Sequence, residues 1–224
     1  MRNGMTQEEL NEALHESAMD DERDEAVRLV EQGAQIDAVN EYGWQALHFA
    51  AGHGHRAMAK LLIARGARVD AADRQGSQPL HHAALMGHGE VVKLLIASGA
   101  KVDAGNNCGS QPLHYVAENG RKDMVELLVA MGAKFEAADN DGARPLHLAA
   151  GHGRGDVVKL LLGYGADPVA LNKKGETPGD LCKKVAIRSL LKKAERELRE
   201  CEALAEHRRR QRQLGALRPK GPAL

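Results

Sequence analysis

The chain has 224 residues, of which 43% are hydrophobic, enough to bury a core and to exclude disorder throughout. Aromatic residues make up only 3%, so the core must be built from Leu, Val, Ile and Ala packed over short distances. The net charge is zero, but residues 1–37 carry 11 acidic and 3 basic side chains whereas residues 183–224 carry 13 basic and 5 acidic ones, giving the molecule an acidic head and a basic tail.

The first predicted element is a helical unit over residues 1–38. The sequence Thr-Gln-Glu-Glu at residues 6–9 has the pattern of a capping box, which marks a helix N-terminus. Apolar residues follow at Leu14, Ala18 and Leu29. The many acidic side chains suit an exposed end of a larger structure, where water would solvate them. We therefore expect an acidic N-terminal capping repeat.

A regular pattern occupies residues 39–171 and continues on both sides. Three series of glycines and one series of Leu-His pairs each recur every 33 residues. The glycines are Gly43, Gly76, Gly109, Gly142 and Gly175; Gly33, Gly66, Gly99, Gly132 and Gly165; and Gly54, Gly87, Gly120 and Gly153. The pairs begin at Leu47, Leu80, Leu113 and Leu146. A fixed period of this length indicates a solenoid of four regular repeats over this range.

Residues 73–104 illustrate how each repeat should fold. Turn residues precede Pro79, which is tolerated in the first turn of a helix because its missing N–H would have no partner there. The short helix that follows stops at Gly87, since glycine adopts the left-handed conformation of many helix ends. A second, more apolar helix runs from Glu90 to Gly99, and the short segment after it suits a hairpin-like link.

These motifs resemble the ankyrin repeat over about residues 10–193. The resemblance rests on the period, on the Pro-Leu-His segments at residues 78–84, 111–114 and 144–150, and on the recurrent Gly-Ala pairs. It implies an all-α, ankyrin-like repeat solenoid of about six helix-turn-helix units, with hairpin tips along one edge and a C-terminal helical extension.

The sequence departs from the family pattern at one position. The family usually has threonine before the proline, and its hydroxyl and the following histidine tie the inner-helix turn together. Only Thr177 fits; the equivalent residues here are Gln45, Gln78, Gln111 and Arg144. Because these longer side chains have no hydroxyl, the family's hydrogen bond is in doubt at these four positions, but the fold is not.

The last predicted elements are a C-terminal capping repeat over residues 172–193 and a charged helix with a basic tail over residues 194–224. Gly179 and Asp180 replace the Leu-His pair in the capping repeat, and such polar departures suit a solvated end. The apolar stripe of the charged helix lasts about two heptads, too few for a coiled coil. Pro219, Gly221 and Pro222 end regular structure. The tail's basic cluster is Arg208, Arg209, Arg210 and Arg212.

The eleven histidines do not indicate a metal site. Four recur in the Leu-His pairs, a structural position in the family, and His55 and His88 follow helix-ending glycines; His53 and His152 are less determined by the repeat. The chain lacks the nucleophile elbow, the zinc-protease motif, the phosphate loop and the dinucleotide fingerprint. We therefore predict no catalytic residue, no metal and no cofactor, and hence no enzyme.

Partner-binding residues should lie where the repeat does not dictate the side chain, on the turn tips and the solvent face of the first helix. The family resemblance implies that these surfaces form a concave groove. Tyr42 and Trp44 are the most informative, because aromatic residues at tips commonly anchor interfaces; alternatively, Trp44 folds over Ala46 and fills local space. The candidates are Tyr42, Trp44, His53, Arg74, Gln75, Ser77, Leu85, Met86, Asn107, Ser110, Asn119, Asp141 and His152.

These observations predict a monomeric protein-interaction module or adaptor that binds another protein. The alternative is a nucleic-acid-associated regulator that acts through the arginine tail, which could equally contact acidic membrane, serve as a nuclear address or be merely solvated. No segment has the roughly 18 apolar residues of a membrane span, and the N-terminus lacks a secretory signal. Cys108, Cys182 and Cys201 suit neither a disulfide framework nor a zinc site. We expect a cytoplasmic location, with the nucleus as the alternative.

Overall fold

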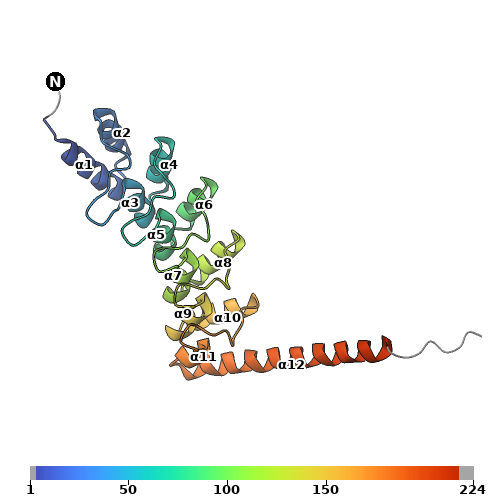
Figure 1. Cartoon of the computed structure of the whole chain (residues 1–224). Coiled ribbons are helices and arrows are strands. Elements are labelled where there is room, and N and C mark those ends of the chain that lie inside the picture. Colours follow the sequence, from blue (N-terminus) through green and yellow to red (C-terminus); the bar gives the residue numbers. More distant parts are fainter. Residues whose placement is uncertain (1–3, 217–224) are drawn as a thin grey trace, which may run out of the picture.

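The computed structural model describes residues 4–216, and over that range the chain is helical and contains no strand. Twelve helices form an inner and an outer layer that stack into a curved row (Figure 1). The inner helices are α1 (Gln7–Met19), α3 (Ala46–His53), α5 (Pro79–Met86), α7 (Pro112–Asn119), α9 (Pro145–Gly151) and α11 (Pro178–Leu181). The outer helices are α2 (Arg23–Gln32), α4 (Arg56–Ala64), α6 (Gly89–Ala97), α8 (Lys122–Ala130), α10 (Gly155–Gly163) and α12 (Val185–Ala216). The predicted all-α repeat solenoid is therefore confirmed.

The helices begin and end at the residues that the sequence indicated. Helix α5 starts at Pro79 and is capped by Gly87, whose φ of 85° is left-handed. At the N-terminus, the Thr6 hydroxyl accepts the backbone N–H of Glu9 at 3.2 Å, and the Thr6 N–H donates to the Glu9 carboxylate at 2.6 Å. This completes the predicted capping box.

The core lies between the two layers and is built from small and branched aliphatic side chains. The inner helices α1, α3, α5, α7 and α9 each contribute a leucine and at least one fully buried alanine, such as Leu80, Ala83 and Ala84 of α5. The outer helix α6 adds Val91 and Leu95 from the other side. Because alanine is small, adjacent inner helices approach closely, and the most extensive contacts between successive repeats run along that layer.

The histidines of the Leu-His pairs connect each repeat to the next. Nδ1 of His81 accepts the backbone N–H of Gln78 at 3.0 Å, so the proton lies on Nε2, which donates to the Ser110 carbonyl of the next repeat at 3.2 Å. The same arrangement recurs at His48, His114 and His147. Burial lowers the pKa of His48 and of His81 to about 4. The histidines therefore act as neutral structural links.

The family's threonine cap is missing at the substituted positions. Gln45, Gln78 and Gln111 form no side-chain cap hydrogen bond, and within residues 4–216 their Oε1 atoms are buried without a partner. In contrast, the Thr177 hydroxyl accepts the Asp180 N–H at 3.2 Å. The turn at each glutamine is thus secured by the histidine side chain and by the backbone bond from the histidine N–H to the glutamine carbonyl.

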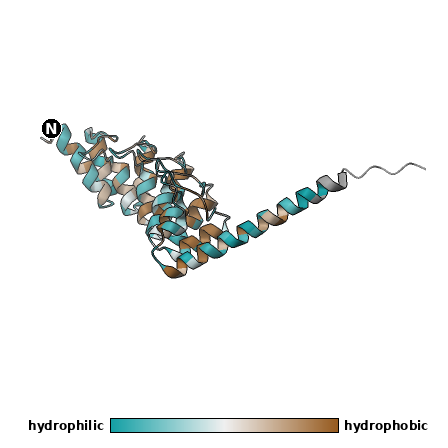
Figure 2. Cartoon of the chain, turned by 60° about the horizontal axis from the view of Figure 1, so that its bottom comes forward, coloured by the Kyte–Doolittle hydropathy of each residue, from teal (hydrophilic) through white to brown (hydrophobic). Residues whose placement is uncertain are grey.

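Helix α12 is continuous from Val185 to Ala216 and crosses the boundary drawn at residues 193 and 194. Ile187 and Leu191 are buried at its start, where it packs on α11 and α10. Its remaining length projects away from the stack, at the end opposite the N-terminus, and is mostly hydrophilic (Figures 1 and 2). The helix breakers predicted at 219–222 lie outside the described residues. Within residues 4–216, every helix is too short or too polar to cross a membrane.

Candidate functional site

Each tip of the solenoid is the same tight turn closed by one side chain. Asn40 Oδ1 accepts the backbone N–H groups of Tyr42 and Trp44, both at 2.9 Å. Equivalent turns form around Asp73, Asn106, Asp139 and Asn172. A short polar side chain that accepts two N–H groups holds its turn without help from a neighbouring strand.

Neighbouring tips are joined into one row by hydrogen bonds between repeats. The Arg74 N–H donates to the Tyr42 carbonyl at 3.0 Å, and the Asn107 N–H donates to the Gln75 carbonyl at 3.0 Å. The Asn107 side chain also donates to the Arg74 carbonyl at 3.0 Å. The tips are therefore fixed relative to one another.

Most of the predicted partner-binding residues lie on this surface. Tyr42, His53, Arg74, Gln75, Met86, Asn107, Asn119, Asp141 and His152 are exposed, and Trp44, Leu85 and Ser110 are half-buried. Ser77 is only 4% exposed. Its carbonyl accepts the hydrogen bond from His48 and its N–H donates to Asp73, so a partner could not reach this side chain.

Trp44 has a packing role in addition to its exposed edge. Its ring meets Phe49 and His82 edge-on, with centroid separations of 5.2 and 4.6 Å. His82 belongs to the next repeat, so the indole joins two repeats. Tyr42, by comparison, is 62% exposed and is the freer of the two aromatic side chains.

Three candidates at the ends of inner helices bond back to their own helix. His53 Nδ1 donates to the Phe49 carbonyl at 3.0 Å and Asn119 Nδ2 donates to the Tyr115 carbonyl at 2.9 Å. His152 Nδ1 makes the same bond within α9, at 3.0 Å. These bonds orient the side chains at the rim of the inner-helix face.

A hollow of about 620 Å³ lies between two neighbouring tips and the inner helices α7 and α9. It brings together the predicted residues Arg74, Gln75, Asn107 and Ser110. Four further contributors come from inner helices: His114, Tyr115, Glu118 and Leu148. Of these, only Glu118 lies where the sequence predicts partner contacts, on the inner helix next to Asn119. Two of these belong to a visible series, since the residue after each Leu-His pair is Phe49, His82, Tyr115 or Leu148. The variation of the residue after the Leu-His pair is therefore the sequence signal that could have identified Tyr115 and Leu148.

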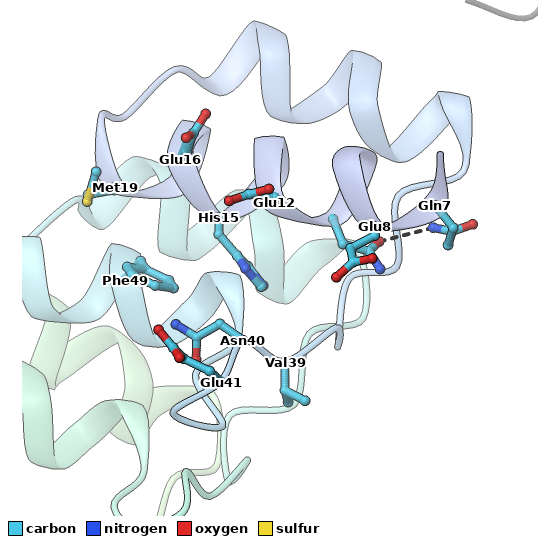
Figure 3. Close-up of a pocket in the computed structure, with 11 residues that line it drawn as sticks. Gln7, Glu8, Glu12, His15, Glu16, Met19, Val39, Asn40, Glu41 and Phe49 are labelled. Carbon is cyan, nitrogen blue, oxygen red and sulfur yellow. Dashed lines mark hydrogen bonds between the residues drawn. The ribbon is translucent and has the colours of Figure 1, made fainter. Parts of the chain in front are cut away.

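A second hollow, of about 660 Å³, lies at the N-terminal end between α1 and the first tip (Figure 3). Its rim carries Glu8, Glu12 and Glu16 of α1 and Glu41 of the tip. Its other lining residues are Gln7, Asn11, His15, Met19, Val39, Asn40 and Phe49. Apart from Glu41, which lies on a predicted turn tip beside Tyr42, these residues are not among the predicted binding positions, because the sequence predicts that water solvates the acids of the first repeat at an exposed end. The four-residue spacing of three glutamates was the available signal.

The basic cluster lies far from both hollows. Arg208, Arg209, Arg210 and Arg212 are exposed on the projecting part of α12, and Arg210 pairs with Glu206 at 2.6 Å. The arginines are thus presented on a helix rather than in the solenoid surface.

Comparison with known proteins agrees with the architecture. The family model described as ankyrin repeats in three copies matches residues 14–106 and 100–172. A comparison with curated proteins gave no significant match. The matched residues cover more than half of the chain, and helices α2 to α10 and the four tips at Asn40, Asp73, Asn106 and Asp139 lie within them. The chain therefore belongs to the ankyrin repeat family.

Proposed function

We propose that the chain is an adaptor that binds another protein through its tips and concave face. Ankyrin repeats are general protein-interaction modules, and the family is typically non-enzymatic. The observation that carries the proposal is the row of tips joined by hydrogen bonds such as Arg74 to Tyr42. A surface ordered before binding loses little conformational entropy on association.

The side chains of this row divide into two regions. In the early repeats Tyr42 and Met86 are 62% and 51% exposed, and they supply apolar area of the kind that anchors interfaces. In the later repeats Asn107 and Asp141 present polar groups, which favour orientation and specificity over raw affinity. The partner is expected to place an apolar group against the early repeats.

The test is the double variant Tyr42→Ala and Met86→Ala, measured against a partner identified by affinity capture. We expect the dissociation constant to rise at least tenfold, about 1.4 kcal/mol. Trp44 is left intact because its packing against Phe49 and His82 would confound affinity with stability. The matched control is Lys60→Ala on the outer helix α4, which should leave the affinity unchanged. Equal affinities for a folded double variant and the control would refute the anchor.

The alternative function, binding of nucleic acid through the arginine tail, is supported by the exposure of Arg208, Arg209 and Arg212 on a projecting helix. A helix of this kind can place several cations along a phosphate backbone. The described part of α12 has no Phe, Tyr or Trp on which bases could stack. We therefore rank this function second and give its test below.

A further inference from the structure

The hollow at the N-terminal end, called the N-terminal groove from here on, combines an apolar floor with a rim of carboxylates. Met19 and Phe49 line it on one side and Val39, which is 59% exposed, on the other. Glu12 and Glu16 stand above them on α1 (Figure 3). Such a groove suits a ligand that carries apolar and cationic groups on the same face.

The glutamates of this rim have no internal counter-charge. Within residues 4–216, none of Glu8, Glu12, Glu16 and Glu41 forms an ion pair. Three of them follow one another at four-residue spacing, so they lie on one face of α1, where like charges destabilise a helix. A bound cation would relieve this repulsion, and an adjacent low-dielectric floor strengthens the attraction.

The complementary surface is present on the projecting part of α12. Leu204 is 59% exposed, and Arg208 and Arg212 follow it at the same four-residue spacing, so the three side chains share one helix face. Within the described residues neither arginine forms an ion pair, whereas Arg210 does. This face of the helix has no partner in the solenoid.

We propose that the N-terminal groove of one copy binds the distal part of α12 of a second copy. If α12 of the second copy runs antiparallel to α1 of the first, Leu204 of the second copy lies against Met19 and the floor of the groove. One turn further on, Arg208 then approaches Glu16. A second turn brings Arg212 to Glu12, because both helices advance about 6 Å per four residues.

The tail cannot reach the groove of its own chain. Helix α12 leaves the stack at the end opposite α1 and points away from it (Figure 1). The contact is therefore head-to-tail between copies, and such a heterologous contact builds open chains or, where the rotation closes, rings. It differs from the monomer expected from the sequence. It shares the first tip with the proposed adaptor surface but uses neither Tyr42 nor Met86, so the double variant at those residues tests the adaptor function separately.

The experiment compares the full chain with two charge-reversal variants by sedimentation velocity over a range of concentrations. One variant is Glu12→Arg with Glu16→Arg, and the other is Arg208→Glu with Arg212→Glu. We expect the wild-type mass to rise with concentration at 50 mM salt, and each variant to weaken association at least tenfold. Mixing the two variants should restore it, because each groove then meets a tail of opposite charge. Raising the salt to 300 mM should weaken the wild-type association severalfold.

The matched control is Asp24→Arg with Glu31→Arg, which makes the same charge change on the outer helix α2, away from the groove. It should associate like the wild type. A wild-type chain that stays monomeric at all concentrations would overturn the proposal, as would a control that loses association as fully as the groove variant. Failure to restore association on mixing, with both variants folded by circular dichroism, would also overturn it.

Discussion

The paired histidines can link the repeats only while they are neutral. Nδ1 of each ring accepts a backbone N–H, so a proton on that nitrogen would remove one of the two bonds. Burial lowers the pKa of His114 and of His147 below the usual value, as it does for His48 and His81. The unfolded chain has no such restriction and binds protons near the ordinary histidine pKa.

Stability should therefore fall as the pH drops below about 6.5. Between this value and the folded pKa of about 4 at His48 and His81, the unfolded chain binds more protons, so the free energy of unfolding decreases with decreasing pH. At each of these two histidines, proton binding by the unfolded chain should lower the free energy of unfolding by up to about 3 kcal/mol at pH 4. Urea midpoints measured from pH 7.5 to 5 would show this decline. In His81→Gln the decline should be shallower, and an unchanged slope would contradict the assignment.

The glutamine that stands where the family has threonine should lower the stability of the fold, and a threonine at that position should raise it. Gln78→Thr removes a buried, unpartnered Oε1 and supplies a hydroxyl that can accept the His81 N–H, as Thr177 does for Asp180. We expect the free energy of unfolding to rise by about 1 kcal/mol. Thermal unfolding monitored by circular dichroism measures it. Gln78→Ala serves as the control, since it removes the amide without adding a cap, and it should give the smaller gain.

At the scale of elements, two glycines allow the cost of a left-handed backbone to be measured separately from the cost of a steric clash between neighbouring tips. Gly76 and Gly132 both have positive φ, at 77° and 95°. A Cβ at Gly76 would lie 2.6 Å from the backbone N of Asn107 in the next tip, whereas a Cβ at Gly132 would meet nothing within 4 Å. The first glycine therefore serves the contact between tips and the second only a helix end.

Alanine at these two positions should consequently have unequal effects. Gly132→Ala is expected to cost about 1–2 kcal/mol from the left-handed φ alone. Gly76→Ala should cost at least about 1 kcal/mol more, because the backbone of Asn107 must move. The comparison is made by urea denaturation of both variants. Equal losses would show that adjacent tips are not held tightly.

The sequence predicted the helix ends well because they depend on local chemistry. Pro79 and Gly87 determine where α5 begins and ends whatever surrounds them. The N-terminal groove was not predicted, because it forms only when α1 faces the tip that carries Val39. Nor could the sequence show that Ser77 is buried, since that depends on its bond to His48 of the preceding repeat.

At the scale of the whole molecule, the acidic first repeat and the described part of the basic segment, which ends at Ala216, lie at opposite ends of the stack (Figure 1). The charge separation along the sequence is thus also a separation in space. Either end can therefore be removed by truncation without removing the other.

Truncation at Lys193 removes the arginine cluster and keeps every tip residue. The truncated chain should retain its protein partner with only a modest change in association rate. The full chain should bind DNA or RNA weakly at most, with a salt dependence no steeper than about four released counterions. Electrophoretic shift assays at several salt concentrations measure this. Sequence-selective, submicromolar binding that is lost on truncation would favour the nucleic-acid function over the adaptor.

The stacking of each repeat on its neighbours also determines how the molecule should respond to a stretching force. The main helix contacts join neighbouring repeats, so an end repeat is held on one side only and an interior repeat on both. Pulling on the two ends should therefore detach repeats one at a time, beginning at an end. Each 33-residue repeat would release roughly 110 Å of extended chain, and the protein would lengthen in equal steps instead of rupturing at once.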